Sequence, residues 1–406
     1  MTAGSARDAI VRPARGTRPA NRRQLITAAA ADLFSRNGYA RVGLSEVAEA
    51  VAIGPSALYR HFGSKQALLA TVVSDAGKTV DSALTAAAES NSGLDVAEAL
   101  AVAVLAHRSA GVLWQREARQ LAPTDRADFQ ADVDRIATRF AALIRSRRPG
   151  VGSAEADLLA WSGLAVATSV SYHSLVLPEP DFTTLLGVLI SLAIDAPIPR
   201  LESTSPRNVT PGALQPRSRR EAILTEATKL FAANGFAGVS TEDIGASVGI
   251  TGPSVYNHFP AKSDILAAAM LRGDEWLRMD MHRVFAQATD PRDGLNRLLA
   301  SYCSFVLDNP HLVQVLVCES AHLPEPERHR TRAAQYAYIA EWVDLLCKVH
   351  PQWDAVHARI RVQAAQTVMN DVALTHHLLR YRNIESALVA IGTEILLRDN
   401  VRHVRR

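Results

Sequence analysis

The sequence predicts an all-α protein built from two related domains in tandem. Apolar residues recur every three or four positions through nearly every segment, and no alternating strand pattern with hairpin turns is present. Residues 21–69 are repeated, in register and without a gap, as residues 218–266, which lie 197 positions later. This period is too long for a solenoid, whose units run to roughly 20–50 residues. Each copy therefore belongs to a whole domain.

Length and composition agree with this division. The chain has 406 residues and 48% hydrophobic residues, enough for two domains with real cores. The first 20 residues form a basic arm without the apolar stretch of a secretory signal. The longest apolar runs, 158–177 and 185–194, are interrupted or too short to span a bilayer. We therefore expect a soluble, cytoplasmic protein without a membrane partner.

Charge is unevenly distributed between the two copies. Residues 1–69 contain ten Arg or Lys against four Asp or Glu, whereas residues 200–266 contain seven against six. The formal net charge of +3 therefore conceals a basic N-terminal module. Such a module suits a polyanionic partner, although charge alone predicts only a general attraction.

The first copy predicts a small helical head at 21–69, followed by a helical body at 70–195. A helix over 22–36 ends at Asn37-Gly38, because glycine readily adopts the left-handed conformation after a helix. A short helix over 44–51, a turn at 52–54 and another short helix through Phe62 complete the head. Long helices follow from Lys65. Breaks are expected near 92–93, 122–123, 149–150 and 178–180.

The second copy predicts the same plan, with a head at 217–266 and a body at 267–406. Ser240 and Asp243 have the spacing of a capping box at the start of a short helix. Gly249 supplies the turn, and Thr251 caps the next helix. In this body, breaks are expected near 290–291, 309–310, 324–326, 350–351 and 382–383.

The first head has the weaker local signals. Gly43 stands where the second copy has Ser240, and Ala52 stands where it has Gly249. Each difference is expected to cost the first head a few tenths to ~1 kcal/mol of stability. Between the domains, residues 196–216 contain five prolines, and we expect a semi-extended linker that packs poorly.

Two short helices joined by a tight turn, after a longer helix, are typical of a helix-turn-helix head. Apolar pairs at i and i+4, Leu58/Phe62 and Val255/Phe259, anchor the second short helix of each head inward. The other residues of this helix and its ends are left to face DNA. They are Ser56, Tyr59, Arg60 and His61 in the first head, and Gly252, Ser254, Tyr256, Asn257 and His258 in the second.

Both heads resemble those of the TetR family of bacterial repressors. The most specific shared segment is Tyr-x-His-Phe-x-x-Lys, which occurs as residues 59–65 and 256–262. The resemblance implies that the Tyr, the His and the lysines Lys65 and Lys262 approach phosphates of a double-stranded DNA operator. It also implies that each body binds a small effector and forms a dimer interface. The duplicated architecture, with Gly43 and Ala52 in the first head, departs from the family pattern.

The outward position between Tyr and His differs between the heads. It is Arg60 in the first and Asn257 in the second. Arginine suits a guanine edge and asparagine suits an adenine edge, so the heads would prefer different half-sites if these side chains reach bases. The alternative is that both side chains touch only phosphate.

The bodies share a weaker similarity, between residues 113–121 and 315–323, which supports duplication of the whole domain. Polar or aromatic residues in apolar helical stretches are candidate effector contacts, although core or surface roles are the alternative for each one. A pocket with mostly apolar walls would suit a small, hydrophobic effector. The candidates are Trp114, Arg116, Tyr172, His173, Tyr302, Glu319, His322, Trp342 and Asn370.

Two arrangements of the bodies are open. The apolar final helices, 183–194 and 384–397, could pair within one chain as a pseudo-dimer or between two chains as a homodimer. A linker of about 20 residues reaches for either.

Other classes of function have little support. No GxGxxG, Walker or GxSxG motif is present, so we expect no enzyme, no catalytic residue and no cofactor. Glu319 and His322 lack a third metal ligand, so no metal site is expected. The sequence therefore predicts a ligand-responsive, DNA-binding transcriptional repressor. The alternative is a helical sensor or interaction protein in which only the second head binds DNA.

Overall fold

The computed structural model describes residues 21–89, 96–203 and 217–399. The expected basic arm at 1–20 lies outside these residues. Over the described ranges the chain is helical throughout, and its only β-type contact is an isolated bridge between Ser203 and Tyr381. The all-α prediction is therefore confirmed.

The first half forms a three-helix head and a six-helix body. Most expected breaks coincide with helix ends, but a further break after residue 106 and a π-helical turn at Leu113–Glu117 were not predicted. The helices are α1 (Arg22–Asn37), α2 (Leu44–Ala50), α3 (Pro55–His61), α4 (Lys65–Glu89), α5 (Val96–Ala106), α6 (Ala110–Val112), α7 (Pro123–Arg147), α8 (Ser153–Thr168) and α9 (Asp181–Ile194).

The second half repeats this order, and its α14 (Pro291–Asp308) and α15 (Pro310–Cys318) are longer than their counterparts α5 and α6. Its expected breaks also fall at helix ends, because Pro at the first helical position and Asp or Asn before it are local start signals. The helices are α10 (Arg219–Asn234), α11 (Thr241–Ser247), α12 (Gly252–Val255), α13 (Lys262–Gln287), α14 (Pro291–Asp308), α15 (Pro310–Cys318), α16 (Glu325–Val349), α17 (Ala355–Ala373) and α18 (Ile384–Leu397).

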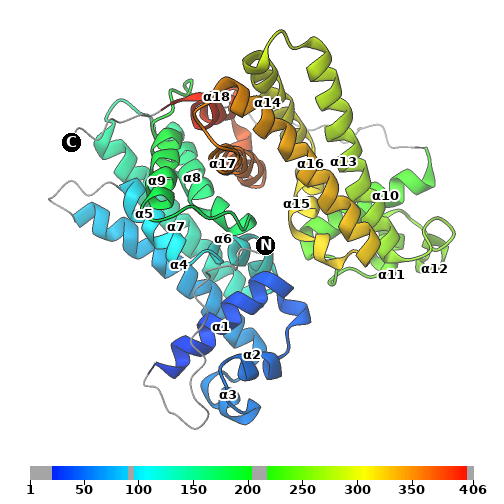
Figure 1. Cartoon of the computed structure of the whole chain (residues 1–406). Coiled ribbons are helices and arrows are strands. Elements are labelled where there is room, and N and C mark those ends of the chain that lie inside the picture. Colours follow the sequence, from blue (N-terminus) through cyan, green and yellow to red (C-terminus); the bar gives the residue numbers. More distant parts are fainter. Residues whose placement is uncertain (1–20, 90–95, 204–216, 400–406) are drawn as a thin grey trace, which may run out of the picture.

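The two bodies pair within the chain. Helices α8 and α9 pack against α17 and α18, so the last helices of both bodies form one central layer (Figure 1). A polar contact closes its edge, where His377 Nε2 lies 2.9 Å from Asp157 Oδ2 and the His377 ring packs beside Trp161. The structure thus has the pseudo-dimer arrangement, and the heads α1–α3 and α10–α12 lie at separate corners of the molecule (Figure 1).

The beginning of the interdomain linker packs against both bodies. Ala196 is fully buried, and the Leu201 N–H donates to Glu155 Oε1 at 2.6 Å. The Arg382 N–H donates to the Glu202 carbonyl at 2.9 Å. The expectation of poor packing is therefore wrong for residues 196–203, because non-proline residues there bury side chains and hydrogen-bond across the bodies. Residues 204–216 of the linker lie outside the described residues.

The hydropathy of the helices was also compared with that of membrane spans. Within the described ranges, no single helix is long and apolar enough to cross a membrane. The pair Val96–Ala106 and Ala110–Gln120 passes by length and composition only if taken together, and it is bent by 81°.

The caps of the two heads differ as the sequence predicts. Ser240 Oγ accepts the Asp243 N–H at 3.1 Å, and Asp243 Oδ2 accepts the Ser240 N–H at 2.8 Å. The Ser240 hydroxyl also donates to Asp243 Oδ2 at 2.7 Å, and this bond together with the one from the Ser240 N–H lowers the pKa of Asp243. At Gly43 only the backbone half of the box exists. Gly249 has a φ of 70°, and Ala52 occupies the same left-handed region with a φ of 56°.

Replacing Ala52 with glycine is expected to stabilise the first head by about 0.5–1 kcal/mol. The left-handed conformation costs an L-residue ~1–2 kcal/mol, and the extra freedom of glycine in the unfolded chain offsets ~0.4–1 kcal/mol of that gain. Amide hydrogen exchange over α2 and α3 measures this local stability. Gly249→Ala is the matched control and should lower protection over α11 and α12. Equal protection in the wild type and Ala52→Gly would contradict the expected strain.

Candidate functional site

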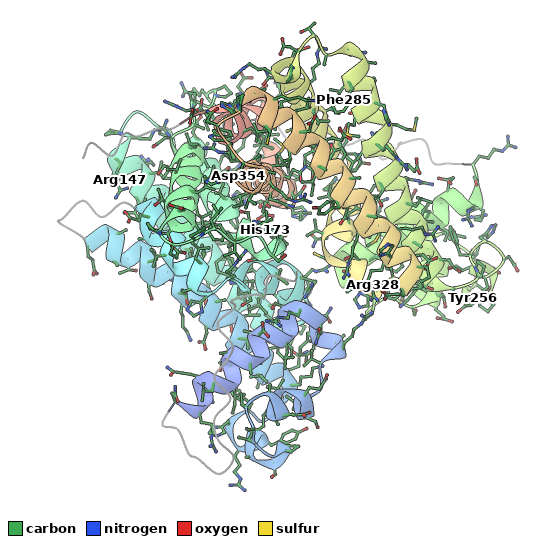
Figure 2. The ribbon with its side chains drawn as sticks, in the orientation of Figure 1. Arg147, His173, Tyr256, Phe285, Arg328 and Asp354 are labelled. Carbon is green, nitrogen blue, oxygen red and sulfur yellow. The ribbon has the colours of Figure 1, made fainter. Side chains whose placement is uncertain are left out.

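The exposed face of each head is built around one tyrosine. Leu58 and Val255 are buried and hold α3 and α12 against their heads. Tyr59 is 54% exposed and Tyr256 is 51% exposed, although both side chains are large and aromatic. Figure 2 shows Tyr256 at the outer edge of the second head. Exposed aromatic residues at equivalent positions on two domains indicate surfaces kept for a partner.

Most of the residues predicted to face DNA lie on this surface. Ser56 and Arg60 are exposed in the first head, and Asn257 is exposed in the second. The half-buried ones are His61, Ser254 and His258.

Two details of the second head differ from the expectation. Gly252 is buried, because the Glu242 side chain covers it and would meet an added Cβ at 3.0 Å. It is therefore not free to meet DNA. Thr251 occupies the position before α12, but its hydroxyl bonds Ser254 Oγ at 2.8 Å, and its side chain caps no backbone N–H.

One arginine in each head anchors the recognition helix. Arg23 donates to the His61 carbonyl at 2.8 Å, and its guanidinium lies 4.3 Å from the Phe62 ring centroid. Arg220 donates to the His258 carbonyl and lies 3.8 Å from the Phe259 ring centroid. Arg23 therefore caps the C-terminal end of α3. A cation that donates to the last carbonyl groups of a helix stabilises its C-terminus.

The motif lysines point into the heads. Lys262 donates to the Phe236 and Val239 carbonyls at 2.8 and 2.7 Å, and Lys65 lies 4.2 Å from the Tyr39 ring centroid. Burial lowers the pKa of Lys262. Both ammonium groups therefore hold the turn after the first helix of their head, and their contact with phosphate stays a prediction.

A buried glutamate joins each head to a body segment. Glu117 Oε2 accepts the Tyr39 N–H at 2.9 Å, and Glu319 Oε2 accepts the Phe236 N–H at 3.1 Å. The two glutamates occupy the same place in the similar segments 113–121 and 315–323. We call each set of glutamate, aromatic residue and motif lysine a head–body joint. Each joint therefore ties the turn after the first helix of its head to one body segment.

The two joints draw their arginines from the same segment. Arg116 pairs with Glu117 and donates to the Phe34 and Ser35 carbonyls at the end of α1. Arg119 crosses to the other half, where it pairs with Glu319 and donates to a carbonyl at the end of α10. Residues 116–119 therefore hold both heads.

The charge on Glu319 is kept by its neighbours. Burial opposes ionisation, but His322 Nδ1, at 3.2 Å, and the Arg119 guanidinium outweigh it, so the pKa of Glu319 lies below its ordinary range. Across the described residues, no group of three His, Cys, Asp or Glu side chains could hold a metal ion.

A cavity of about 640 Å³ is lined by residues of both halves, most of them from the second. Four of the predicted effector residues line it: Arg116, Tyr172, Tyr302 and Asn370. The Tyr302 hydroxyl donates to Asn370 Oδ1 at 2.9 Å, and burial raises the pKa of Tyr302 to about 12. The volume is within the range of ligand pockets, roughly 300–1,000 Å³.

The other predicted effector residues lie elsewhere. Trp114 packs against Phe129 in the first body, and Trp342 is fully buried with its ring edge toward Tyr302. Glu319 belongs to the second joint, and His322 lies beside it, with Nδ1 3.2 Å from Glu319 Oε2.

His173 accepts the Leu175 N–H within the first half, and Figure 2 places it near the centre of the molecule. Burial, together with the charges of Arg108 and Arg359, lowers the pKa of His173 to about 4, so its ring is neutral near pH 7.

Two acidic residues in the cavity wall were missed. Asp371 Oδ1 accepts a hydrogen bond from Gln115, which comes from the other half, and Asp274 lies on α13. Burial raises the pKa of both carboxyl groups to about 7. Their signal in the sequence was an acid within an apolar helical stretch, but acids on exposed helix faces have the same spacing.

Comparison with known proteins identifies the heads. Residues 26–72 and 223–269 match the family described as bacterial regulatory proteins, tetR family. The chain is 31% identical over 156 residues to the HTH-type transcriptional regulator LmrA of Bacillus subtilis, a match covering 37% of this chain and 80% of that protein.

Two further relatives are shorter matches. The chain is 29% identical over 137 residues to the HTH-type transcriptional repressor KstR2 of Mycolicibacterium smegmatis, covering 32% of this chain and 65% of the repressor. It is 30% identical over 122 residues to the nucleoid occlusion factor SlmA of Marinobacter nauticus, covering 30% of this chain and 62% of the factor. The chain thus spans less than two thirds of the length of either protein.

Among solved structures, the chain is similar to a TetR-family transcriptional regulator from Bordetella parapertussis. The TM-score is 0.41 and the identity is 17%, over 45% of this chain and 95% of that one.

Proposed function

Because the chain belongs to the tetR family of bacterial regulatory proteins, we propose that it is a DNA-binding transcriptional regulator that reads one operator with two heads. The observation that carries the proposal is the duplicated exposed surface around Tyr59 and Tyr256, each tyrosine about half exposed over a buried anchor. A helix presented in this way fits the major groove with its outward side chains on base edges and phosphates. The relative named a repressor favours repression as the sign of regulation.

The two heads are proposed to read non-identical half-sites. Arg60 and Asn257 are both exposed at equivalent positions, and neither side chain is used in a hydrogen bond or ion pair among the described residues. Arginine pairs with guanine and asparagine with adenine in the major groove. With both bodies paired inside one chain, a single chain presents two different heads, so its operator need not be a palindrome.

Arg60→Ala and Asn257→Ala are each expected to relax base specificity in a different half of the operator, by about 1–3 kcal/mol. Genome-wide mapping of bound DNA supplies the strongest site, and footprinting with a base-substitution series on that site measures the effect. Arg145→Ala, which removes an exposed arginine from α7, is the control and should leave both halves unchanged. Absence of any specific footprint would reject the proposed function.

A second candidate function keeps DNA binding in the second head alone. Ala52 in the left-handed region and the half-formed cap at Gly43 favour it, because both weaken the first head. A wild-type footprint over one half-site, insensitive to Arg60→Ala and lost in Asn257→Ala, would support this candidate. The first domain would then serve as a sensing or pairing partner.

Ligand responsiveness is proposed to arise at the cavity, because its walls lead to both heads. Arg116 lines it and donates to carbonyls at the end of α1 in the first head. Helix α13 lines it with Asp274 and begins at Lys262, which holds the turn of the second head. A molecule that binds one arrangement of these walls more tightly than another shifts the equilibrium between the two arrangements of the heads. The size of the shift is set by the difference between its two affinities.

A further inference from the structure

The cavity is shared by the two halves of the chain. Gln115 and Arg116 enter its wall from the first half, and Asp274, Gln366 and Asp371 enter from the second. The Gln115 amide bonded to Asp371 joins the two sides. In the first body, Trp114 contacts Gly77, whereas in the second body Leu316 contacts Gly273 and lines the cavity. The smaller leucine leaves room that the tryptophan fills in the other half.

Two arginines of the cavity wall form ion pairs with glutamates that lie outside the cavity. Arg116 is bound to Glu117 and to two backbone carbonyls, and Arg278 is bound to Glu275. Neither Glu117 nor Glu275 lines the cavity. The wall also carries Arg332 and Glu341, which are both exposed and opposite in charge, and His282. Unlike Glu341, the carboxyl groups of Asp274 and Asp371 are held partly away from water, and neither forms an ion pair among the described residues.

These two carboxyl groups lack a cationic partner of their own. The Asp371 carboxyl group accepts only the neutral Gln115 amide among the hydrogen bonds of the described residues. Asp274 has Arg278 nearby, but the guanidinium of Arg278 is bound to Glu275. A carboxylate held partly away from water gains most from a nearby positive charge.

A third polar group in the wall is unused. Gln366 lines the cavity and is only 7% exposed. Its Nε2 has no hydrogen-bond partner among the described residues. A buried amide donor left unpaired costs free energy that an acceptor on a bound molecule would recover. Apolar side chains, among them Leu277, Phe305 and Leu316, line much of the remaining wall.

We propose that this shared cavity binds one lipophilic cation per chain, with its apolar body against α13 and α15 and its positive charge between Asp274 and Asp371. The inference rests on the proposed ligand-responsive function, to which it adds the chemical class of the ligand. The same molecule touches residues tied to both heads, so a single ligand acts on the whole chain.

Isothermal titration with tetraphenylphosphonium, and with its anionic counterpart of the same shape, tetraphenylborate, tests the charge preference. At pH 8 we expect one cation site per chain and an affinity at least about tenfold above that for the anion. Asp371→Asn and Asp274→Asn should each weaken cation binding about tenfold. Asp128→Asn, an exposed acid on α7, is the matched control and should change nothing.

Two further measurements test where the cation binds. Leu316→Trp fills the cavity as Trp114 fills the first body, and it should abolish the cation titration. Between pH 8 and pH 6 the wild-type affinity should fall by at least about tenfold, because two carboxyl groups with pKa values near 7 bind protons in competition with the cation. Asp371→Asn should weaken this pH dependence without abolishing it, because the carboxyl group of Asp274 is still present.

The outcomes separate this inference from the proposed function. Equal binding of cation and anion, or cation binding that persists in Leu316→Trp, would overturn the site. Cation binding that meets every expectation but leaves the operator footprint unchanged would uphold the site and count against ligand responsiveness. Release of both half-sites by the cation would support both.

Discussion

Replacing Arg119 with alanine is expected to lower the free energy of unfolding by about 3–5 kcal/mol, the range for breaking a buried ion pair by removing one partner. The Glu319 side chain is only 2% exposed and would lose its cationic partner. His322 and the Phe236 N–H would remain beside it, and the carbonyl at the end of α10 would lose a donor. Urea unfolding measures the total effect, and hydrogen exchange over α10–α12 measures its local part.

Arg135→Ala is the control for Arg119→Ala. Arg135 also forms two ion pairs, with Asp81 and Asp132, but its side chain is 49% exposed. Exposed pairs contribute about 0–1 kcal/mol, so the control should be nearly neutral. Equal costs for the two variants would contradict the importance of burial at the joint.

A double variant tests the mechanism of the Arg119 effect. Arg119→Met combined with Glu319→Gln removes both charges but keeps an acceptor for the Phe236 N–H. Because the main loss in Arg119→Ala is an uncompensated buried charge, the double variant should recover most of the stability. Its footprint would then show whether the joint is needed for correct placement of the second head.

The elements of the fold were predictable because their signals are local. Asn37-Gly38 ends α1, Asp290-Pro291 starts α14, and Ser240 with Asp243 starts α11, and each signal acts within a few residues. The strained turn at Ala52 was also predictable, because the second copy places glycine at the same position. A tandem repeat thus acts as an internal comparison for its own weak points.

The joints and the cavity were not predictable, because their contacts link residues far apart in the chain. Arg119 meets Glu319 across 200 positions, and Gln115 meets Asp371 across 256. Helical periodicity indicates which face is buried, but it does not indicate which distant residue lies opposite. Glu319 was therefore assigned to an effector pocket, whereas the structure places it in a head–body joint.

The motif lysine illustrates a second limit. Its spacing after the Tyr-x-His-Phe segment is the same in both heads, and the resemblance to the TetR family implied a phosphate contact for it. In the structure, the Lys262 ammonium donates to two carbonyls within its own head. Sequence position defines where the backbone of a lysine lies, but its long side chain reaches either inward or outward.

Asp371→Asn is expected to remove part of the pH dependence of the free energy of unfolding. Burial raises the pKa of the Asp371 carboxyl group from its ordinary value of 3.8 to about 7. Between about pH 4 and pH 7 the folded chain therefore holds a proton that the unfolded chain has lost. Because stability falls with rising pH wherever the folded state binds more protons, the wild type should lose stability through this window and level off above pH 7.

The size of this effect has an upper limit. One pKa unit corresponds to about 1.36 kcal/mol, so a rise from 3.8 to about 7 allows at most ~4 kcal/mol. Partial access to water and the Gln115 amide reduce it, and we expect Asp371→Asn to be more stable than the wild type at pH 8 by about 1–3 kcal/mol. Below pH 4 the two chains should be nearly equal. Urea unfolding at several pH values measures the difference.

Asp243→Asn is the control of opposite sign. Hydrogen bonds from Ser240 lower the pKa of Asp243, so its contribution to stability is present above its ordinary pKa and is lost as the pH falls. The asparagine variant should therefore be less stable than the wild type at neutral pH, whereas Asp371→Asn should be more stable. If both variants lost stability at pH 8, the Asp371 carboxylate would already have a favourable partner, and a cationic ligand would gain nothing from it. The charge-based assignment of the cavity thus depends on the sign of a measurement made without any ligand.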